Sequence, residues 1–262
     1  MTLLEIRGLN VAYNKKNVLS DINLSLNAGE ILGIVGQSGC GKSTLLKTIL
    51  HILPPEAHLT GGDIFYNDAN ITRLTEKNMQ HIRGGEIGMI FQNAQTTLCP
   101  VRTIGQQLVE SVAAHRQNCT KKEIIGEALN LLAKIRLTDG EKILQNYPFE
   151  LSGGMNQRIS IVLAMLLKPK LLLADEPTSA LDVVSQAQVI EEMLNLQRLF
   201  HTGIIFVSHN LSLVARIAKK TAIMQSGKIV EYGETAQIMR NPRHAYTKEL
   251  LNSIFHLNLK RS

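Results

Sequence analysis

The segment that most constrains this chain is residues 36–44, with the sequence Gly-Gln-Ser-Gly-Cys-Gly-Lys-Ser-Thr, which we call the glycine loop. An apolar run precedes it at residues 31–35, and a helix-like run follows at residues 45–50. Glycines let successive backbone N–H groups turn towards one anion, and the positive end of the following helix faces the same charge. In such a loop, Lys42 reaches the outer phosphates of a nucleotide and Ser43 supplies a hydroxyl for its Mg²⁺. The loop therefore predicts a nucleotide-phosphate site, and the alternative is a glycine-rich turn with an incidental lysine.

Length and composition favour a globular protein of the cytosol. A chain of 262 residues with 44% apolar residues is long enough to bury a core. The absence of Trp argues against a stacking surface for single-stranded nucleic acid. Three cysteines without metal-ligand spacing suit the reduced thiols of the cytosol. Because we find neither a signal segment nor an apolar run long enough for a membrane span, we expect a soluble chain that acts at a membrane through partners.

The formal net charge of +6 is concentrated near the C-terminus. Residues 1–214 contain 19 Lys and Arg against 19 Asp and Glu, whereas residues 215–262 contain 9 against 3. A basic tail is either a solvated helix face or a surface for an anionic membrane or an acidic partner. The dispersed charges favour the solvated face.

Strand-like patterns occupy the N-terminal part of the chain. Residues 3–26 contain three short alternating runs, which are typical of antiparallel strands. Tyr13 lies on one of them, where its ring packs in the core or faces a nucleobase. A further strand-like stretch begins at Gly61, and the apolar residues 86–92 predict a buried strand that ends in Gln92.

From residue 93 to about residue 165, apolar residues recur at helical spacing, which predicts a helical lobe inserted in a sheet domain. Its last helix is expected to begin in the sequence Leu-Ser-Gly-Gly at residues 151–154. Ser152 can cap this helix, and Gly153 and Gly154 leave N–H groups open to an anion. The segment therefore predicts a second phosphate-facing site, unless it is only a turn and a helix cap.

Two later apolar runs end in polar residues. Residues 171–174 precede Asp175 and Glu176, and residues 203–207 precede Ser208 and His209. Ligands bind at the carboxyl edge of parallel sheets, so Asp175 can hold a metal ion there while Glu176 orients or deprotonates a water molecule. His209 is either a polar surface residue or a sensor of the γ-phosphate. The alternation of strands and helices predicts an α/β fold with a mainly parallel sheet.

Taken in order, these motifs resemble those of the nucleotide-binding subunit of ABC transporters. The resemblance covers nearly the whole chain, and its most specific part is Leu-Ser-Gly-Gly followed by Gln157 and Arg158. It implies a P-loop NTPase core with an antiparallel β subdomain and an inserted helical subdomain. It also implies a dimer in which residues 152–154 of one subunit, which we call the signature turn, close on ATP bound by the glycine loop of the other.

The resemblance implies roles for individual residues, with ATP and Mg²⁺ as cofactors. The implied catalytic residues are Glu176 as the base, Lys42, Gln92 and His209. The implied ATP contacts are Tyr13, Gly36, Gln37, Ser38, Gly39, Cys40, Gly41, Lys42, Ser43 and Thr44, and in trans Ser152, Gly153, Gly154 and Gln157. The implied Mg²⁺ ligands are Ser43, Gln92 and Asp175. The implied partners are two membrane permease subunits, a second identical or homologous ATP-binding subunit and an extracytoplasmic solute-binding protein, at the cytoplasmic face of the membrane and without nucleic acid.

Finer details resemble the branch that imports peptides and nickel. They are the Tyr-Pro-Phe-Glu of residues 147–150 and the Asn-Pro-Arg-His-Ala-Tyr-Thr of residues 241–247. We assign residues 1–240 to the ATPase domain, with the helical insertion at about 93–165, and residues 241–262 to a tail of the importer type. Phe149, the short tail and the lack of cysteines after Cys119 favour nickel or a nickel–chelator complex as the solute, with di- or oligopeptides as the alternative.

Two other classes are more distant. A soluble ABC ATPase acting on nucleic acid or ribosomes usually has two nucleotide domains or a long coiled-coil insertion, and we find neither here. A P-loop kinase or GTPase leaves the Leu-Ser-Gly-Gly segment unexplained.

Overall fold

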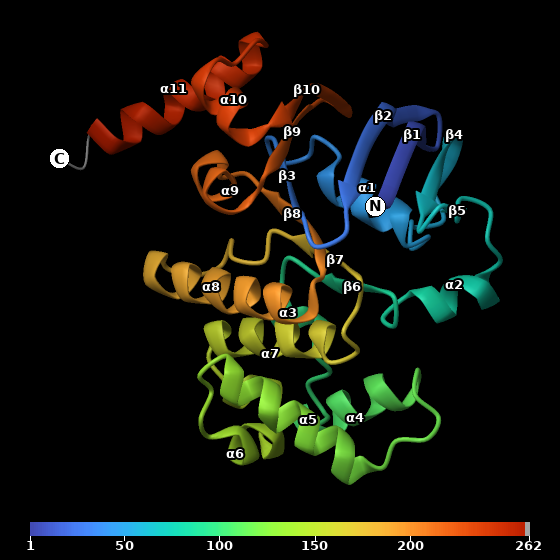
Figure 1. Ribbon diagram of the computed structural model, residues 1–262, viewed down its shortest axis with the longest axis vertical. Coiled ribbons are helices and arrows are strands. Elements are labelled where there is room, and N and C mark those ends of the chain that lie inside the picture. Colours follow the sequence, from blue (N-terminus) through green and yellow to red (C-terminus); the bar gives the residue numbers. More distant parts are fainter. Residues whose placement is uncertain (260–262) are drawn as a thin grey trace. The chain divides into compact units, whose positions relative to one another are not determined.

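The computed structural model describes residues 1–259, without the side chains of residues 95, 96 and 253–259. It divides into two compact units (Figure 1). The first unit contains Met1–Met79 and the chain from Gly203 onwards, and the second contains Gln80–Thr202. The chain enters the second unit within α2 (Glu76–Ile82) and leaves it after α8 (Val183–Phe200).

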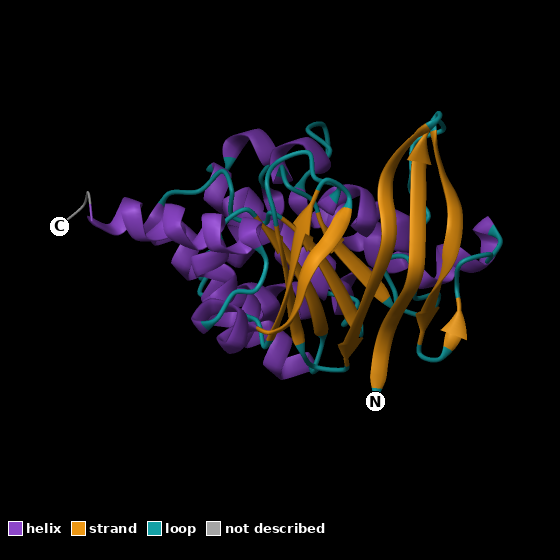
Figure 2. Cartoon of the chain, turned by 90° about the horizontal axis from the view of Figure 1, so that it is seen from above, coloured by secondary structure: helices purple, strands orange, loops and turns teal. Residues whose placement is uncertain are grey.

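An antiparallel sheet forms the N-terminal part of the first unit (the strands beside the N label in Figure 2, in which all strands are orange). Its order is β2-β1-β4-β5, with bounds β1 (Thr2–Tyr13), β2 (Lys16–Asn27), β4 (Ala57–Tyr66) and β5 (Ala69–Asn70). The antiparallel strands predicted over residues 3–26 are confirmed. The predicted start of the next strand at Gly61 is wrong, because residues 57–59 already pair with residues 11–13. The strand continues through the glycines, since the pairing register shifts on both sides of Asn10, which pairs with Gly61.

The second sheet of the first unit lies around β3 (Ile31–Val35), which is buried along its whole length. β3 pairs in parallel with β8 (Gly203–Ser208) on one side and β9 (Lys220–Gln225) on the other, and β10 (Lys228–Glu234) pairs antiparallel with β9. A strand enclosed on both faces is expected to be continuously apolar, as β3 and residues 203–207 of β8 are. The helices of this unit are α1 (Lys42–Ile49), α9 (Leu211–Ile217), α10 (Thr235–Arg240) and α11 (Ala245–Leu259).

The second unit contains the parallel pair β6 (Ile87–Ile90) and β7 (Leu171–Asp175). Its helices are α3 (Ala94–Thr97), α4 (Ile104–Ala113), α5 (Lys121–Lys134), α6 (Gly140–Gln145), the 3₁₀ helix η1 (Pro148–Glu150), α7 (Gly153–Met165) and α8. Thr103 and Thr120 start α4 and α5 with reciprocal capping boxes. Helices α3 to α7 occupy the stretch predicted as an inserted lobe, but the compact unit also includes β6, β7 and α8. The boundaries of the inserted lobe stay a prediction.

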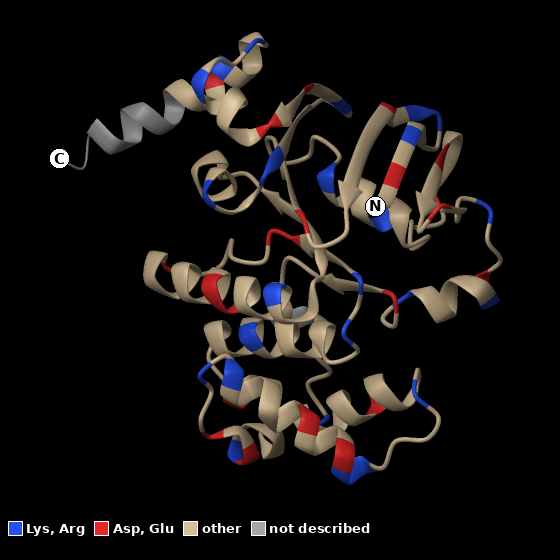
Figure 3. Cartoon of the chain, in the orientation of Figure 1, with Lys and Arg blue, Asp and Glu red and all other residues tan. Residues whose placement is uncertain are grey.

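One predicted strand end is wrong. β6 ends at Ile90, so Gln92 lies beyond the strand and is exposed rather than being its last residue. The α/β fold with parallel strands and a separate antiparallel sheet is confirmed. Figure 3 shows Lys and Arg dispersed over the coloured part of the chain and interspersed with Asp and Glu, and both interpretations of the basic tail stay predictions.

Candidate functional site

The glycine loop connects β3 to α1, as predicted. Gly36 lies against β9, where a Cβ atom would come within 2.2 Å of the carbonyl oxygen of Met224, so no side chain fits. Gly41 precedes α1 with a φ of 107°, a conformation that favours glycine, and provides no side-chain cap. The N-terminal N–H groups of α1 are therefore left without a side-chain cap from Gly41, which suits the binding of a phosphate group.

Lys42 is the first residue of α1 and is only 5% exposed. Its Nζ atom donates hydrogen bonds to the carbonyl oxygens of Gly36 at 2.8 Å and of Gln37 at 2.9 Å. The ammonium group thus lies inside the curve of the loop, close to the helix N-terminus. The nine predicted phosphate-site residues lie together in one loop and one helical turn, with residues 37–39 exposed at its rim.

His209 lies at the same sheet edge as the glycine loop. β3 and β8 are parallel neighbours, and Val35 pairs with Ser208 in the register. Gly36 and His209 follow these two residues, so the two segments leave the sheet side by side, and His209 is exposed. Tyr13 is the last residue of β1 and is half-buried, which leaves both interpretations of its ring open.

In the second unit, the structure brings Gln92, Asp175 and Glu176 to one sheet edge. Ile90 pairs with Ala174 in the parallel register of β6 and β7, and the three polar residues follow within two positions. Asp175 is buried, whereas Glu176 is half-buried and adopts a positive φ of 45°. Each of these three residues has a side-chain oxygen atom, as Ser43 of the first unit does. Oxygen is the ligand atom that Mg²⁺ prefers.

The signature turn starts α7. The Ser152 Oγ atom accepts a hydrogen bond from the Met155 N–H group at 3.3 Å, so the predicted helix cap is present. Ser152 and Gly153 are exposed, so a helix N-terminus lies at the surface of this unit. The structure differs from the prediction at Gln157, which is 5% exposed because it shares the inward face of α7 with Asn156 and Ser160. Its burial does not support a direct contact with ATP.

The sequence motif included Arg158 without giving it a role, and the structure provides one. The guanidinium group of Arg158 donates to both carboxylate oxygens of Glu192 on α8, at 2.8 and 2.5 Å, and also to the carbonyl oxygen of Ile135 at the end of α5. The side chains of Arg158 and Glu192 are 13% and 5% exposed. Burial raises the pKa of Glu192, although the hydrogen bonds from Arg158 oppose this shift. The pair fixes the helix that carries the signature turn against its two neighbours.

Asp182, which precedes α8, is a helix cap. Its Oδ1 atom accepts hydrogen bonds from the N–H groups of Val184 and Ser185, both at 3.0 Å, and its Oδ2 atom accepts one from the Ser185 hydroxyl at 2.6 Å. The hydrogen bonds from the hydroxyl and the N–H group of Ser185 hold the pKa of Asp182 below its ordinary value. The carboxylate therefore stays ionised at neutral pH and orders the start of α8.

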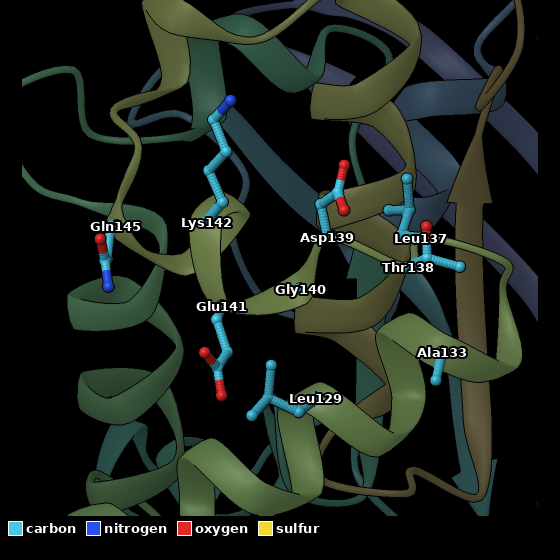
Figure 4. A pocket seen from close by; sticks show the side chains of 9 residues that line it. All are labelled: Leu129, Ala133, Leu137, Thr138, Asp139, Gly140, Glu141, Lys142 and Gln145. Carbon is cyan, nitrogen blue, oxygen red and sulfur yellow. The ribbon is translucent and has the colours of Figure 1, made fainter.

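A hollow of about 790 Å³ lies on the second unit, between α5 and α6 (Figure 4). Apolar side chains such as Leu129 and Leu137 and polar ones such as Asp139 and Lys142 line it. None of the predicted site residues lines this hollow. We therefore do not assign nucleotide binding to it.

Comparison with known proteins shows the class to which this fold and these motifs belong. Residues 19–179 match the family model described as "ABC transporter", and the chain belongs to that family. Residues 230–262 match a second model, "Oligopeptide/dipeptide transporter, C-terminal region".

Individual relatives agree with this assignment. The oligopeptide transport ATP-binding protein OppD of Bacillus subtilis is 40% identical over 257 residues, which are 96% of this chain and 72% of that protein. The metal-staphylopine import system ATP-binding protein CntD of Staphylococcus aureus is 36% identical over 260 residues, which are 98% of this chain and 95% of that protein. The solved dimer of the ATP-binding cassette MJ0796 with ADP and phosphate has a TM-score of 0.78 and 25% identity, covering 89% of this chain and 99% of that one.

The chain is therefore the ATP-binding subunit of an ABC importer, and it hydrolyses ATP to drive transport. Among residues 1–259, no helix has the length and apolar character needed to cross a membrane.

The buried pair of Arg158 and Glu192 leads to a prediction about stability. Replacing Glu192 with Gln leaves the guanidinium group of Arg158 buried without a counter-charge, so we expect the free energy of unfolding to fall by about 3 kcal/mol. The matched control is Glu191→Gln, because Glu191 forms an exposed ion pair with Arg136 at 3.7 Å and its loss costs less than about 1 kcal/mol. Urea denaturation measures both, and equal losses in the two variants would contradict the role given to Arg158.

Proposed function

We propose that this chain powers the uptake of short peptides through membrane permeases. The observation that carries this proposal is the match of residues 230–262 to the C-terminal region of oligopeptide and dipeptide transporters. The names of relatives such as OppD, and of the dipeptide transport protein DppD of Bacillus subtilis at 39% identity, point the same way.

Nickel or a nickel–chelator complex, the solute favoured by the sequence, is the second candidate. It is supported by the similarity to CntD, a metal-staphylopine import protein whose length this chain covers to 95%. Among the residues whose side chains the structure describes, there is no group of three or more His, Cys, Asp or Glu residues that could hold a metal ion. For either solute, we assign its recognition to the permeases and the solute-binding protein rather than to this chain.

For ATP, we propose that the glycine loop holds the phosphates. The close approach of Gly36 to β9 and the lack of a side-chain cap at Gly41 support this assignment. Lys42 balances the charge of the outer phosphates, and Ser43 with Asp175 and Gln92 supplies oxygen ligands for Mg²⁺. When bound, Mg²⁺ neutralises charge that develops on the transferred phosphoryl group. Tyr13 is the residue we assign to the adenine ring.

For hydrolysis, we propose Glu176 as the residue that orients water or removes its proton. Glu176 follows buried Asp175 at the end of β7 and is half-buried, which gives a carboxylate at the ligand-binding edge of a parallel pair. His209 is proposed to contact the γ-phosphate, since it follows β8 at the edge where the glycine loop begins.

We further propose that two ATP-binding subunits, identical or homologous, enclose ATP between the glycine loop of one and the signature turn of the other. The exposed N-terminus of α7 is the kind of surface that binds an anion. The dimeric form of the solved relative supports this arrangement. The assembly then includes two permeases and an extracytoplasmic solute-binding protein, lies at the cytoplasmic face of the membrane and needs no nucleic acid.

Two substitutions separate binding from chemistry. Glu176→Gln should keep ATP affinity and lower turnover by at least about 100-fold, because the base is lost. Lys42→Ala should weaken ATP binding by about tenfold or more, because a charged hydrogen-bond donor to the phosphates is removed. ATP affinity and steady-state hydrolysis are measured for both, with exposed Glu191→Gln as the control. A Glu176→Gln enzyme with normal turnover would remove Glu176 from this role.

Dimerisation should depend on ATP and on the signature turn. In the Glu176→Gln background, light scattering should show a monomer without nucleotide and a dimer with Mg-ATP, because ATP binding is linked to association. Adding Ser152→Asp should abolish the dimer, since aspartate keeps the helix cap but places a negative charge beside the phosphates. Thr103→Asp likewise replaces an N-cap residue with aspartate, at the start of α4, and should leave the dimer intact. A dimer that survives Ser152→Asp as well as Thr103→Asp counts against the signature turn.

The solute can be identified with the transporter reconstituted in membranes together with its native partners. We expect short peptides loaded on the solute-binding protein to stimulate ATP hydrolysis, because the binding protein and permeases select the solute. Nickel and a nickel–chelator complex are tested in parallel. Stimulation by nickel or its complex alone would replace the peptide proposal with the second candidate and leave the ATPase activity untouched.

A further inference from the structure

The tail of the chain contacts the glycine loop directly. Tyr246 lies in the first turn of α11 (red in Figure 1) and is 4% exposed. Its hydroxyl oxygen accepts a hydrogen bond from the backbone N–H group of Gln37 at 3.0 Å, across 209 positions of the sequence. The role of this tyrosine was not predicted from the sequence, in which residues 241–247 served only to indicate the branch.

Glu231 on β10 holds the turn that leads to Tyr246. Its carboxylate accepts hydrogen bonds from the N–H groups of Arg243 at 2.9 Å and His244 at 3.1 Å. Burial alone would raise the pKa of Glu231, but the neighbouring Thr247 hydroxyl and the hydrogen bonds from these two N–H groups keep it below its ordinary value. The Tyr246 N–H group also donates to the Nδ1 atom of His244 at 3.2 Å. The position of the tyrosine is therefore set by the sheet and not only by the tail helix.

Gln37 is bound on both of its backbone polar groups. Its N–H group donates to Tyr246, and its carbonyl oxygen accepts from the Nζ atom of Lys42 at 2.9 Å. At the other end of the loop, the Gly227 N–H group donates to the carbonyl oxygen of Cys40 at 2.9 Å. The tyrosine hydroxyl and the lysine ammonium are thus linked through one residue of the loop.

We propose that Tyr246 is a positioning residue for ATP binding, because its hydroxyl fixes Gln37 and with it the resting geometry of the glycine loop and of Lys42. This inference rests on the proposed role of the glycine loop in holding the phosphates. A loop that is ordered before the ligand arrives loses less entropy when it binds. Once ATP is bound, the phosphates hold the loop. The hydroxyl therefore strengthens ATP binding and does not change the rate of the chemical step. Burial raises the pKa of Tyr246, so the hydroxyl keeps its proton at neutral pH and the contact does not depend on titration.

The test is Tyr246→Phe in the full chain, which removes one oxygen atom. We expect the KM for ATP to rise roughly three- to tenfold, the range that the loss of one hydrogen bond gives, while kcat stays at the wild-type value. Hydrogen exchange in residues 36–41 should become faster. The matched control is Tyr232→Phe, because the Tyr232 hydroxyl also bonds main chain, donating to the Ser25 carbonyl oxygen at 2.9 Å. Tyr232→Phe should leave the KM for ATP and the exchange of the loop unchanged.

Lys42→Ala separates failure of this inference from failure of the proposed function. If Lys42→Ala binds ATP normally, the glycine loop is not the ATP site and both proposals fall. If Lys42→Ala loses binding while Tyr246→Phe keeps the wild-type KM, or shifts it no more than Tyr232→Phe does, only the role of Tyr246 is overturned. A fall in kcat without a change in KM would likewise overturn it, because a positioning role in binding predicts the opposite.

Discussion

The close contact of the glycine loop with β9 and with the turn after it is the constraint on which the first unit depends. A side chain at Gly36 would collide with the Met224 carbonyl oxygen, and a Cβ atom at Gly41 would lie 2.8 Å from Leu19 on β2. Hydrogen bonds complete the contact, since Gly227 donates to Cys40 and accepts from the N–H group of Ser20. Main-chain hydrogen bonds therefore join β2 of the antiparallel sheet, the turn between β9 and β10, and the glycine loop. Both ends of the loop are therefore held against the sheets, while residues 37–39 between them are exposed.

Patterns that depend on near neighbours could be predicted from the sequence. The buried strands β7 and β8 follow from short apolar runs, and the glycine loop follows from its glycines and their flanking elements. The helical stretch after residue 93 follows from the spacing of apolar residues, and its main helices are strengthened by capping boxes at Thr103 and Thr120. These features require no knowledge of which distant residues meet.

Features that depend on distant partners could not be predicted in this way. The burial of Gln157 results from the orientation of α7 within its unit, and the ion pair of Arg158 joins residues 34 positions apart. The early start of β4 depends on its pairing with β1, which the glycines at residues 61 and 62 concealed. The contact of Tyr246 with Gln37 spans most of the chain. A tyrosine in a polar tail gives no local signal that its hydroxyl will meet a loop in another part of the sequence.

The orientation of the signature turn depends on the buried ion pair between Arg158 and Glu192. Ser152 caps α7 at the surface, while Arg158 in the next turns of the same helix reaches α8 and the end of α5. A buried ion pair adds little net stability compared with apolar packing, but separating its partners is costly because it leaves a buried charge without its counter-charge. The direction of the helix N-terminus is therefore set inside the unit, while Ser152 and Gly153 are exposed at the start of the helix.

Hydrogen bonds join the tail that matches peptide transporters to the glycine loop, the proposed ATP site. Residues 230–262, the part that matches peptide transporters, include Glu231, His244 and Tyr246, which together form the described route from β10 to the glycine loop. A ligand or partner changes an equilibrium only as far as it binds two states with different affinity. Because Tyr246 contacts the loop through a single hydrogen bond, anything that displaces the start of α11 changes the free energy of the loop by about the 1 kcal/mol that such a bond contributes. On the proposed role of the glycine loop, that is enough to alter ATP affinity severalfold while leaving the fold intact, so the tail would tune nucleotide binding without taking part in hydrolysis.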